Sequence, residues 1–308
     1  MDTPIYSIII PHKNSPTLLQ RCLNSIPNNK DIQIIIVDDN SSSEIVDFEH
    51  FPGINEDNIK VIYTKDGKGA GYARNKGLEF AKGKWILFAD ADDYFTDDFY
   101  SIISGYSNSD SDIVFFSANS IYPETGEEAK RHYSINESVI SCLNGDETYL
   151  RFHRASPIAK MINRELIEKY NINFDEVIAS NDTMFSLQTG YYAKKIIADR
   201  RIIYTITVNS GSLEYSYSKD ILLSRIGVDY RTNHFCKLHD ISLKVRILRY
   251  ILPLRHVSKR VFLKELIKYF IRYPFGAVKD IIHFECCSVK QLIMKSKGND
   301  KSYIKINK

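Results

Sequence analysis

The sequence predicts an α/β protein with a mostly parallel, doubly wound sheet, followed by a helical region. Three observations predict this fold. Short apolar runs of strand length alternate with helix-compatible segments over the first hundred residues. The runs are apolar throughout, which is typical of parallel strands covered on both faces. After residue 218 the composition changes, and basic and apolar residues alternate at helical spacing.

The expected elements follow in chain order. Residues 5–10, 33–37, 60–63 and 85–88 are predicted strands, and residues 15–26, 42–48 and 69–81 are predicted helices between them. Pro16 directly after Ser15 is typical of a helix start. Further along, 96–106, 165–170 and 182–192 are predicted helices and 112–116 and 201–208 predicted strands, whereas the polar stretch 117–144 gives no assignment. In such sheets ligands bind at the carboxyl ends of the strands.

We expect three regions. Residues 1–218 form a catalytic domain, with a nucleotide-binding half over about 1–116 and an acceptor half over about 117–218. Residues 210–218 resemble a mobile loop because they are rich in Ser and Gly. Residues 219–308 form a basic helical region, interrupted at Pro253 and Pro274 and ending in a frayed, lysine-rich segment at 295–308.

The net charge of +3 conceals a strong asymmetry. Residues 219–308 contain 20 Lys and Arg against 7 Asp and Glu, a balance of +13. Residues 1–218 contain 21 and 31, a balance of −10. The two regions are therefore expected to have opposite electrostatic roles.

The cysteines predict a reducing compartment. The five of them have no paired metal spacing, and Cys286 and Cys287 are adjacent, so we expect reduced thiols in a cytosolic protein. The chain starts without a basic leader, and no apolar run reaches the roughly 18 residues that span a bilayer.

Two carboxylates follow the second predicted strand. Asp38 and Asp39 at the carboxyl end of an apolar run are costly to bury unless a partner donates hydrogen bonds to them. The imide N–H of a nucleobase is one such partner. The alternative is that Asp39 or Ser41 only caps the helix that follows.

A glycine-rich loop follows the third predicted strand. Gly67, Gly69 and Gly71 free the backbone for close approach and open a helix, whose free N–H groups favour phosphate. Arg74 lies one turn into this helix and is suited to a diphosphate or carboxylate. The pattern matches neither a Walker loop nor a dinucleotide fingerprint. The alternative is a loop whose glycines serve tight packing alone.

A third acidic cluster follows the fourth predicted strand. Asp90 and Asp92 alternate around Ala91, and this spacing can place both carboxylates around one hard divalent cation. Mg²⁺ and Mn²⁺ prefer oxygen ligands together with substrate phosphates. The alternative is an acidic cap for the next helix, which accounts for one or two of the aspartates but not for Asp93 as well.

Taken in order, these motifs resemble family 2 glycosyltransferases with the GT-A fold, the kind that builds bacterial capsules and lipopolysaccharides. The resemblance covers about residues 5–215. It is carried by 7–11 (SIIIP) with Asn14, by 37–41 (VDDNS), by 71–77 (GYARNKG) and by 83–93 (GKWILFADADD).

The resemblance implies a role for each matched residue. Pro11, Lys13 and Asn14 would line the base pocket, Asp39 next to Asp38 would read the uracil edge, and the Gly69–Gly71 loop and Arg74 would lie near the diphosphate. Asp90 would contact the ribose or donor sugar and Asp92 would coordinate Mn²⁺ or Mg²⁺. In the second half, Asp182 matches the family's general base, which takes the proton of the acceptor hydroxyl.

The sequence departs from the family pattern at two places. His12 and Lys13 stand where Thr and Tyr are common, so an aromatic residue stacked on the base is absent from this position. Asn181 stands where the family usually has Glu before the base. His234 and His239 are candidates for a further metal ligand only by position, and each is more simply a surface or core histidine.

The resemblance implies a metal-dependent, inverting hexosyl- or N-acetylhexosaminyltransferase in polysaccharide biosynthesis. Its donor would be a UDP-sugar, and its acceptor a saccharide or a lipid-linked glycan. The alternative enzyme is a sugar-nucleotide nucleotidyltransferase, which typically has a glycine-rich basic loop after the first strand; here that position has Pro11 and no glycine.

The basic region 219–308 leaves three possibilities open. Its mixture of apolar and basic residues is typical of helices on anionic membranes, which would make the enzyme peripheral at the inner face of the cytoplasmic membrane. It equally suits a homo-oligomer interface or plain packing on the catalytic domain. Nucleic acid is not an expected partner, because the carboxylates at the strand ends would repel a phosphate backbone and no nucleic-acid motif is present.

Overall fold

The computed structural model describes residues 3–208 and 217–274. The chain forms two compact units, Met1–Ser216 and Tyr217–Lys308. Three sequence predictions concern residues outside the described ranges, wholly or in part: the loop at 210–218, the Cys286–Cys287 pair and the lysine-rich end at 295–308.

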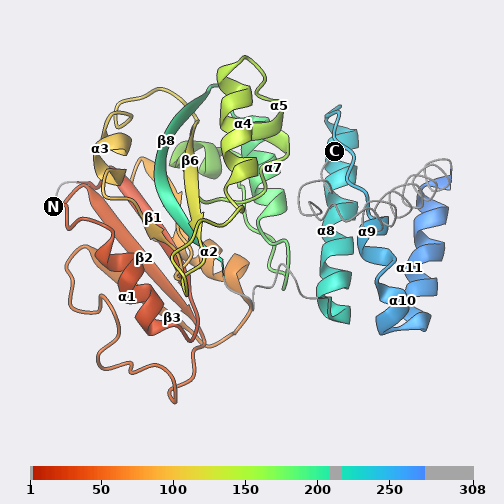
Figure 1. Cartoon of the computed structure of the whole chain (residues 1–308), viewed down its shortest axis with the longest axis horizontal. Coiled ribbons are helices and arrows are strands. Elements are labelled where there is room, and N and C mark those ends of the chain that lie inside the picture. Colours follow the sequence, from red (N-terminus) through yellow and green to blue (C-terminus); the bar gives the residue numbers. More distant parts are fainter. Residues whose placement is uncertain (1–2, 209–216, 275–308) are drawn as a thin grey trace. The chain divides into compact units, whose positions relative to one another are not determined.

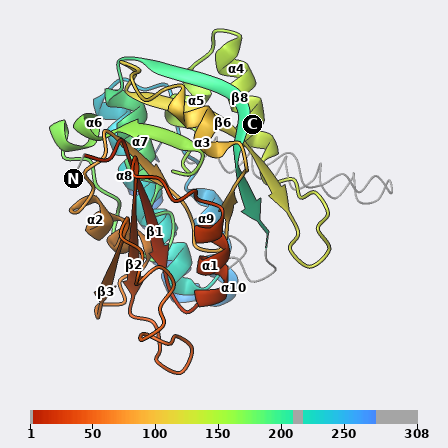
Figure 2. The ribbon, with the colours of Figure 1, turned by 90° about the vertical axis from the view of Figure 1, so that its left-hand side faces the viewer.

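The first unit is built on one eight-stranded mixed sheet. Its strand order is β3-β2-β1-β4-β7-β6-β8-β5. The strands are β1 (Tyr6–His12), β2 (Ile32–Asp39), β3 (Ile59–Thr64), β4 (Trp85–Phe88), β5 (Tyr94–Phe95), β6 (Ile113–Ile121), β7 (Lys160–Asn163) and β8 (Ile196–Thr207). Strands β1 to β4 are mutually parallel, and Figure 2 shows β1, β2 and β3 side by side. Within the described residues, the antiparallel strand pairs are β7 with β4, β7 with β6, and β5 with β8.

Helices cover both faces of this sheet. Ile8 and Ile10 of β1 belong to one apolar cluster and Ile9 to the other, and all three are fully buried. The first cluster holds α1 (Pro16–Asn24) and α3 (Phe99–Ser104), and the second holds α2 (Ala70–Leu78), α6 (Arg164–Lys169) and α7 (Thr183–Tyr192). Burying each isoleucine contributes roughly 1.5–3 kcal/mol. The continuous apolar runs therefore identified central strands, as predicted.

The second half of the first unit contains a longer strand and more helices than the sequence pattern predicts. β6 extends to residue 121 and crosses the expected boundary between halves at 116, so one sheet joins both halves. The helix α4 (Tyr133–Leu143) lies in the stretch 117–144 that gave no assignment, and α5 (Thr148–Phe152) follows it. In Figure 1 the parallel strands β6 and β8 lie next to each other.

The helix predicted at 42–48 is wrong. These residues form turns and irregular structure. The Ser42 N–H donates to the Asn14 side-chain oxygen at 2.8 Å, and Ile45 is 54% exposed instead of facing the core. A tertiary hydrogen bond and two nearby aromatic residues, Phe48 and Phe51, hold this segment, so local helical spacing does not decide its structure.

The second unit is helical. It contains α8 (Lys219–Leu238), α9 (Leu248–Ile251), α10 (Leu254–Val257) and α11 (Lys259–Arg272). Pro253 lies at the N-cap of α10, so the predicted interruption is confirmed there. The Asn233 side chain exchanges two hydrogen bonds with the backbone of Val245, at 2.7 and 2.9 Å, and so holds the segment between α8 and α9. Within the described ranges, no helix has the length and apolar content needed to cross a bilayer.

Candidate active site

The carboxyl ends of β1 to β4 lie together, and the predicted site residues other than Asp182 lie at or after these strand ends. At the end of β1, His12 is buried and links two loops. The Ser15 N–H donates to His12 Nε2 at 3.1 Å, so Nδ1 carries the proton and donates to Asp38 Oδ2 at 2.8 Å. Ser41 donates its N–H and hydroxyl to the same carboxylate, at 3.0 and 2.5 Å.

Asp38 therefore has its hydrogen-bond partners inside the protein. It is 1% exposed. Burial opposes ionisation of this carboxyl, but the hydrogen bonds from His12 and Ser41 outweigh burial and lower its pKa. The predicted nucleotide-binding residue thus fixes the β1 and β2 loops, and His12 has a structural function at the position where the family commonly has Thr.

Asp39 holds the glycine-rich loop. Its Oδ2 accepts the Gly69 N–H at 2.7 Å and its Oδ1 accepts the Lys68 N–H at 3.1 Å. Gly69 is the N-cap of α2 with a φ of 92°, which a residue with a side chain rarely adopts. Lys13 Nζ lies 4.0 Å from Asp39 Oδ2. The backbone N–H groups of Lys68 and Gly69, in the loop predicted to bind phosphate, therefore donate to the Asp39 carboxylate in this structure.

Two further predicted residues shape the same loops. Pro11 pairs with Val37 across β1 and β2. Asn14 has a φ of 54°, and its N–H donates to Ser41 Oγ at 2.8 Å. Both residues lie beside the Asp38–Asp39 segment, where the base pocket is expected.

Gly71 allows α2 to approach the segment that precedes α7. A side-chain Cβ at Gly71 would lie 2.2 Å from the Asp175 carbonyl oxygen and 2.9 Å from Asn181 Cβ. Only glycine fits there without a shift of the backbone. The predicted donor loop and the segment that contains Asp182 are therefore in direct contact.

Arg74 connects the two parts of the site by hydrogen bonds. Nη2 donates to Asp90 Oδ1 at 2.6 Å and Nη1 donates to Asn181 Oδ1 at 3.0 Å. Arg74 is 5% exposed, and its guanidinium lies 5.3 Å from the centroid of the Phe174 ring. The Asp90 side chain remains 38% exposed, and the Asp90 backbone N–H donates to the Tyr204 hydroxyl at 2.8 Å.

The carboxylates of the acidic cluster after β4 oppose one another's ionisation. Burial and then the neighbouring Asp90 raise the pKa of Asp92. Burial raises the pKa of Asp93 well above its ordinary value, with Asp90 and Asp92 adding to the effect. Asp93 itself is structural, because its Oδ1 accepts the Thr207 N–H at 2.7 Å.

This charge repulsion fits a divalent cation at Asp92. A cation would relieve the repulsion between the carboxylates and take its other ligands from phosphate oxygens and water. Among the described residues, no three His, Cys, Asp or Glu side chains are grouped as a complete metal site. His239 directly follows α8 and packs against the Phe235 ring of that helix. His234 lines a pocket of the second unit.

Asp182 is the N-cap residue of α7, but its carboxylate makes no capping hydrogen bond. Only its carbonyl oxygen takes part in the helix, by accepting the Ser186 N–H at 3.0 Å. Burial raises the pKa of Asp182, Arg74 opposes this shift, and Asp90 adds to it. A half-buried carboxylate with a raised pKa and no capping hydrogen bond is suited to accept a proton.

The sequence did not indicate two buried cations of the acceptor half, Arg154 and Lys160. The available signal is a lysine inside the apolar run 157–162, which is too short to predict a strand by its pattern alone.

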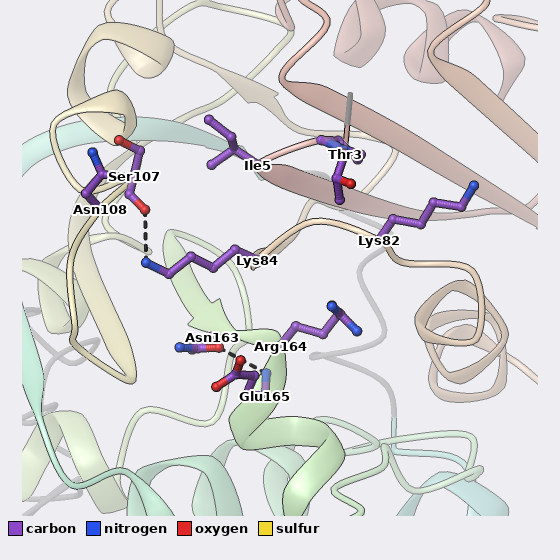
Figure 3. A pocket seen from close by; sticks show the side chains of 10 residues that line it. Thr3, Ile5, Lys82, Lys84, Ser107, Asn108, Asn163, Arg164 and Glu165 are labelled. Carbon is purple, nitrogen blue, oxygen red and sulfur yellow. Dashed lines mark hydrogen bonds between the residues drawn. The ribbon is translucent and has the colours of Figure 1, made fainter. Parts of the chain in front are cut away.

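A separate cavity of about 280 Å³ lies at the opposite ends of the strands. It is lined by Thr3 and Ile5 before β1, Lys84 before β4, and the β7–α6 junction. Figure 3 shows Lys84 directed to the Ser107 carbonyl oxygen, to which it donates at 3.1 Å. This cavity contains none of the predicted site residues.

Comparisons with known proteins identify a family for this chain. The family model for glycosyl transferase family 2 matches residues 7–171. The putative glycosyltransferase EpsH of Bacillus subtilis (strain 168) is 25% identical over 250 residues, covering 76% of this chain and 69% of EpsH. The uncharacterized glycosyltransferase EpsJ of the same strain is 27% identical over 271 residues, covering 82% of this chain and 77% of EpsJ.

Two solved structures share the fold. S. aureus TarS 1-349 in complex with UDP-GlcNAc has a TM-score of 0.59 at 20% identity, covering 86% of this chain and 74% of TarS 1-349. The mannosyltransferase PcManGT from Pyrobaculum calidifontis, in complex with GDP-Man and Mn²⁺, has a TM-score of 0.51 at 14% identity, covering 94% and 81%. The predicted α/β fold of the GT-A type is therefore confirmed.

Proposed function

Because this chain belongs to glycosyl transferase family 2, we propose that it transfers a sugar from a UDP-sugar to a saccharide or lipid-linked acceptor, with inversion at the anomeric carbon. One observation carries the proposal. Arg74 binds Asp90 and Asn181 at the same time. It therefore connects the loop after β4, where the donor is expected, to the segment that contains Asp182. These contacts support a single site for donor and base.

The residues have distinct roles in this proposal. Asp182 accepts the proton of the acceptor hydroxyl, whose oxygen bonds to the anomeric carbon as the bond to the diphosphate breaks. Asp39 accepts the uracil imide N–H, and Asp90 contacts the ribose or the donor sugar. Asp92 would hold a divalent cation, which neutralises charge on the leaving diphosphate when bound.

Structures of the same fold support a nucleotide-sugar donor, and one of the two supports UDP. TarS 1-349 was solved with UDP-GlcNAc and PcManGT with GDP-Man and Mn²⁺. A screen of UDP-, GDP- and dTDP-sugars with Mn²⁺, read as released nucleotide, tests the proposal directly. We expect UDP from UDP-sugars. Release of pyrophosphate instead would indicate a nucleotidyltransferase, and release of GDP or dTDP alone would contradict the uracil assignment to Asp39.

We propose that the chain acts in the synthesis of a bacterial surface polysaccharide, such as a capsule or lipopolysaccharide. We also propose that its second unit binds an anionic membrane surface. Exposed apolar side chains of α11 support this: Ile267 is 59% and Ile271 is 77% exposed, and each directly precedes a basic residue. Those basic residues, Lys268 and Arg272, line a pocket of about 260 Å³ against α8. Such alternation is typical of helices that lie in a membrane interface.

The membrane proposal has a direct test in the full-length chain. Flotation with vesicles of anionic lipid should carry the protein upward, whereas neutral vesicles should not. Ile267→Ser with Ile271→Ser should reduce flotation, and the matched pair Ile45→Ser with Ile178→Ser, both also exposed, should not. If the Ile267 and Ile271 variant floats normally but loses mass by light scattering, α11 is a homo-oligomer interface instead.

A further inference from the structure

A cavity of about 260 Å³ lies in the second unit, between α8 and α11. Four of its lining residues are spaced as on one face of α8, and the other two lie one turn apart on α11. The six are Gly227, Tyr230, Arg231, His234, Lys268 and Arg272. Three of these six are Lys or Arg, and none is an acid. The lining of this cavity is therefore positively charged.

Tyr230 holds two of the cations beside its ring. The centroid of the ring lies 5.0 Å from Lys268 Nζ and 5.0 Å from the Arg272 guanidinium carbon. The face of an aromatic ring attracts a cation, so both side chains of α11 are drawn to the same residue of α8. Two like charges are thereby kept near one another, although they repel. An anion between the two helices would relieve this repulsion.

The hydroxyl of the same tyrosine lacks a hydrogen-bond partner. Tyr230 is 4% exposed, and its buried hydroxyl makes no hydrogen bond within the described residues. A buried polar group without a partner is unfavourable and calls for an explanation, of which a bound ligand is one. A ligand that accepts hydrogen bonds and carries negative charge would satisfy both the hydroxyl and the cations.

The charge balance favours an anion with two negative charges. Arg231, Lys268 and Arg272 carry three positive charges. The carboxylate of Glu265, which is 7% exposed, contacts Lys268 Nζ at 3.4 Å and contributes one negative charge. The balance is +2. A phosphate monoester carries about −1.5 to −2 at neutral pH, whereas a phosphodiester carries a single negative charge. The planar fork of an arginine also matches the oxygens of phosphate.

We propose that this cavity binds a phosphate monoester, which accepts hydrogen bonds from the cations of α8 and α11 and from the Tyr230 hydroxyl. The phosphate group belongs either to the headgroup of a lipid or to a soluble molecule. Its position favours a lipid, because Lys268 and Arg272 directly follow Ile267 and Ile271, the exposed apolar side chains of the proposed membrane surface. The lipid source rests on that proposed membrane binding, whereas the phosphate site itself does not.

Thermal unfolding of the full-length chain tests the site, with inorganic phosphate as the probe. A ligand of the folded state raises the unfolding midpoint, so phosphate should raise it more than chloride at equal ionic strength. Lys268→Gln with Arg272→Gln should increase the phosphate concentration needed for a given rise by roughly tenfold or more. Lys237→Gln with Lys264→Gln is the matched control, because it removes two exposed charges from the same two helices outside the cavity. An equal phosphate response of both double variants overturns the proposal.

Tyr230→Phe tests the hydroxyl by the same measurement. Because the hydroxyl has no partner within the described residues, its removal should not lower the midpoint in chloride. The rise that phosphate causes should be smaller in this variant than in the wild type, because one donor to the ligand is lost. A phosphate response equal to that of the wild type would overturn the place of Tyr230 in the site.

Vesicles distinguish the two sources of phosphate. Phosphatidic acid exposes a phosphate monoester and phosphatidylglycerol a phosphodiester, and the two are compared at equal surface charge. If a lipid headgroup is the ligand, the full-length chain should bind phosphatidic acid roughly tenfold more tightly, and Lys268→Gln with Arg272→Gln should remove this preference. Equal binding to both vesicles, with the response to inorganic phosphate retained, assigns the site to a soluble phosphate.

The membrane proposal and the phosphate site fail in different ways. Ile267→Ser with Ile271→Ser should weaken binding to both kinds of vesicle and leave the response to inorganic phosphate unchanged. If the wild type binds neither vesicle but responds to phosphate through Lys268 and Arg272, the membrane proposal fails and the phosphate site stands. If it binds both vesicles but shows no such response, the phosphate site fails and the membrane proposal stands.

Discussion

Arg74 binds Asp90 and Asn181 with the two ends of one guanidinium, at 2.6 and 3.0 Å. Asn181 stands where the family usually has a glutamate, so the bond on that side is to a neutral amide. Asp90 is then the single carboxylate that receives a hydrogen bond from this guanidinium among the described residues. The arginine orients both segments by its planar geometry, which a lysine cannot reproduce.

Arg74→Lys should therefore retain the charge but lose the bridge. A hydrogen bond between charged groups is worth about 1.5–3 kcal/mol, so we expect turnover to fall by roughly 10- to 100-fold. Donor turnover measured as released nucleotide checks this. Arg164→Lys, at an exposed pair with Glu168 on α6, is the control and should change turnover little. Equal activity of the two variants would contradict the bridging role.

Asp182→Asn should lower turnover by on the order of 10²–10⁴, the range for a general base, while donor binding persists. Since the Asp182 carboxylate makes no capping hydrogen bond, the thermal unfolding midpoint of the Asp182→Asn variant should stay near that of the wild type. Steady-state kinetics with nucleotide binding by calorimetry separates the two effects. Asp110→Asn, at an exposed pair with Lys195, is the control. Near wild-type turnover in Asp182→Asn would show that the base is another group.

Asp92→Ala should abolish the dependence of nucleotide binding on Mn²⁺. Binding is measured by calorimetry with Mn²⁺ and with a chelator. Asp93→Ala is a useful contrast, because Asp93 accepts the buried Thr207 N–H; its loss should cost about 1–3 kcal/mol of stability. The same response to Mn²⁺ in Asp92→Ala as in the wild type would refute a metal ligand at Asp92.

Asp229 in α8 gives the second unit a pH-dependent stability. Burial raises its pKa to about 6, against opposition from Arg249 at 3.4 Å. A carboxyl whose pKa is raised on folding stabilises the fold when protonated. That stability is fully present below about pH 4 and is lost as pH rises through 6, by about 3 kcal/mol.

The test of this pH dependence compares the wild type with Asp229→Asn by denaturant unfolding from pH 4 to 7. The wild type should lose stability relative to the variant as pH rises across this window. Asp220→Asn, at an exposed position in the first turn of α8, should show no such difference. A wild type that gains stability over Asp229→Asn with rising pH would contradict the raised pKa.

Much of the first half of the fold could be predicted because its signals are local. Strands β1 to β4 are apolar runs, and a doubly covered parallel sheet needs little else. β7 escaped prediction since it has only four residues and begins with Lys160, whose burial depends on Arg154 and Ser186 from distant parts of the chain. The 42–48 segment failed for the same reason, because a hydrogen bond to Asn14 decides its structure.

The sequence predicts several residues of the candidate site but not the hydrogen bonds that these residues make. Asp90, Asp92 and Asp182 stand at strand or helix ends, as the sequence indicates. That Asp38 bonds to His12, and that Asp39 holds the amides of the glycine loop, depends on loop geometry that no spacing rule contains. Arg74 was assigned to the nucleotide, and its contacts to Asp90 and Asn181 appear only once the loops are folded.

The contact between Gly71 and the Asp175 carbonyl oxygen limits how this enzyme can be recombined with its relatives. No side chain separates the two backbones, so the loop before α7 fits against α2 only where α2 has a glycine. A hybrid that takes residues 1–116 from one enzyme and the following segment from another should assemble only if both parents have glycine at this position. Donor preference and acceptor preference are therefore exchanged most safely as loops that leave this contact intact.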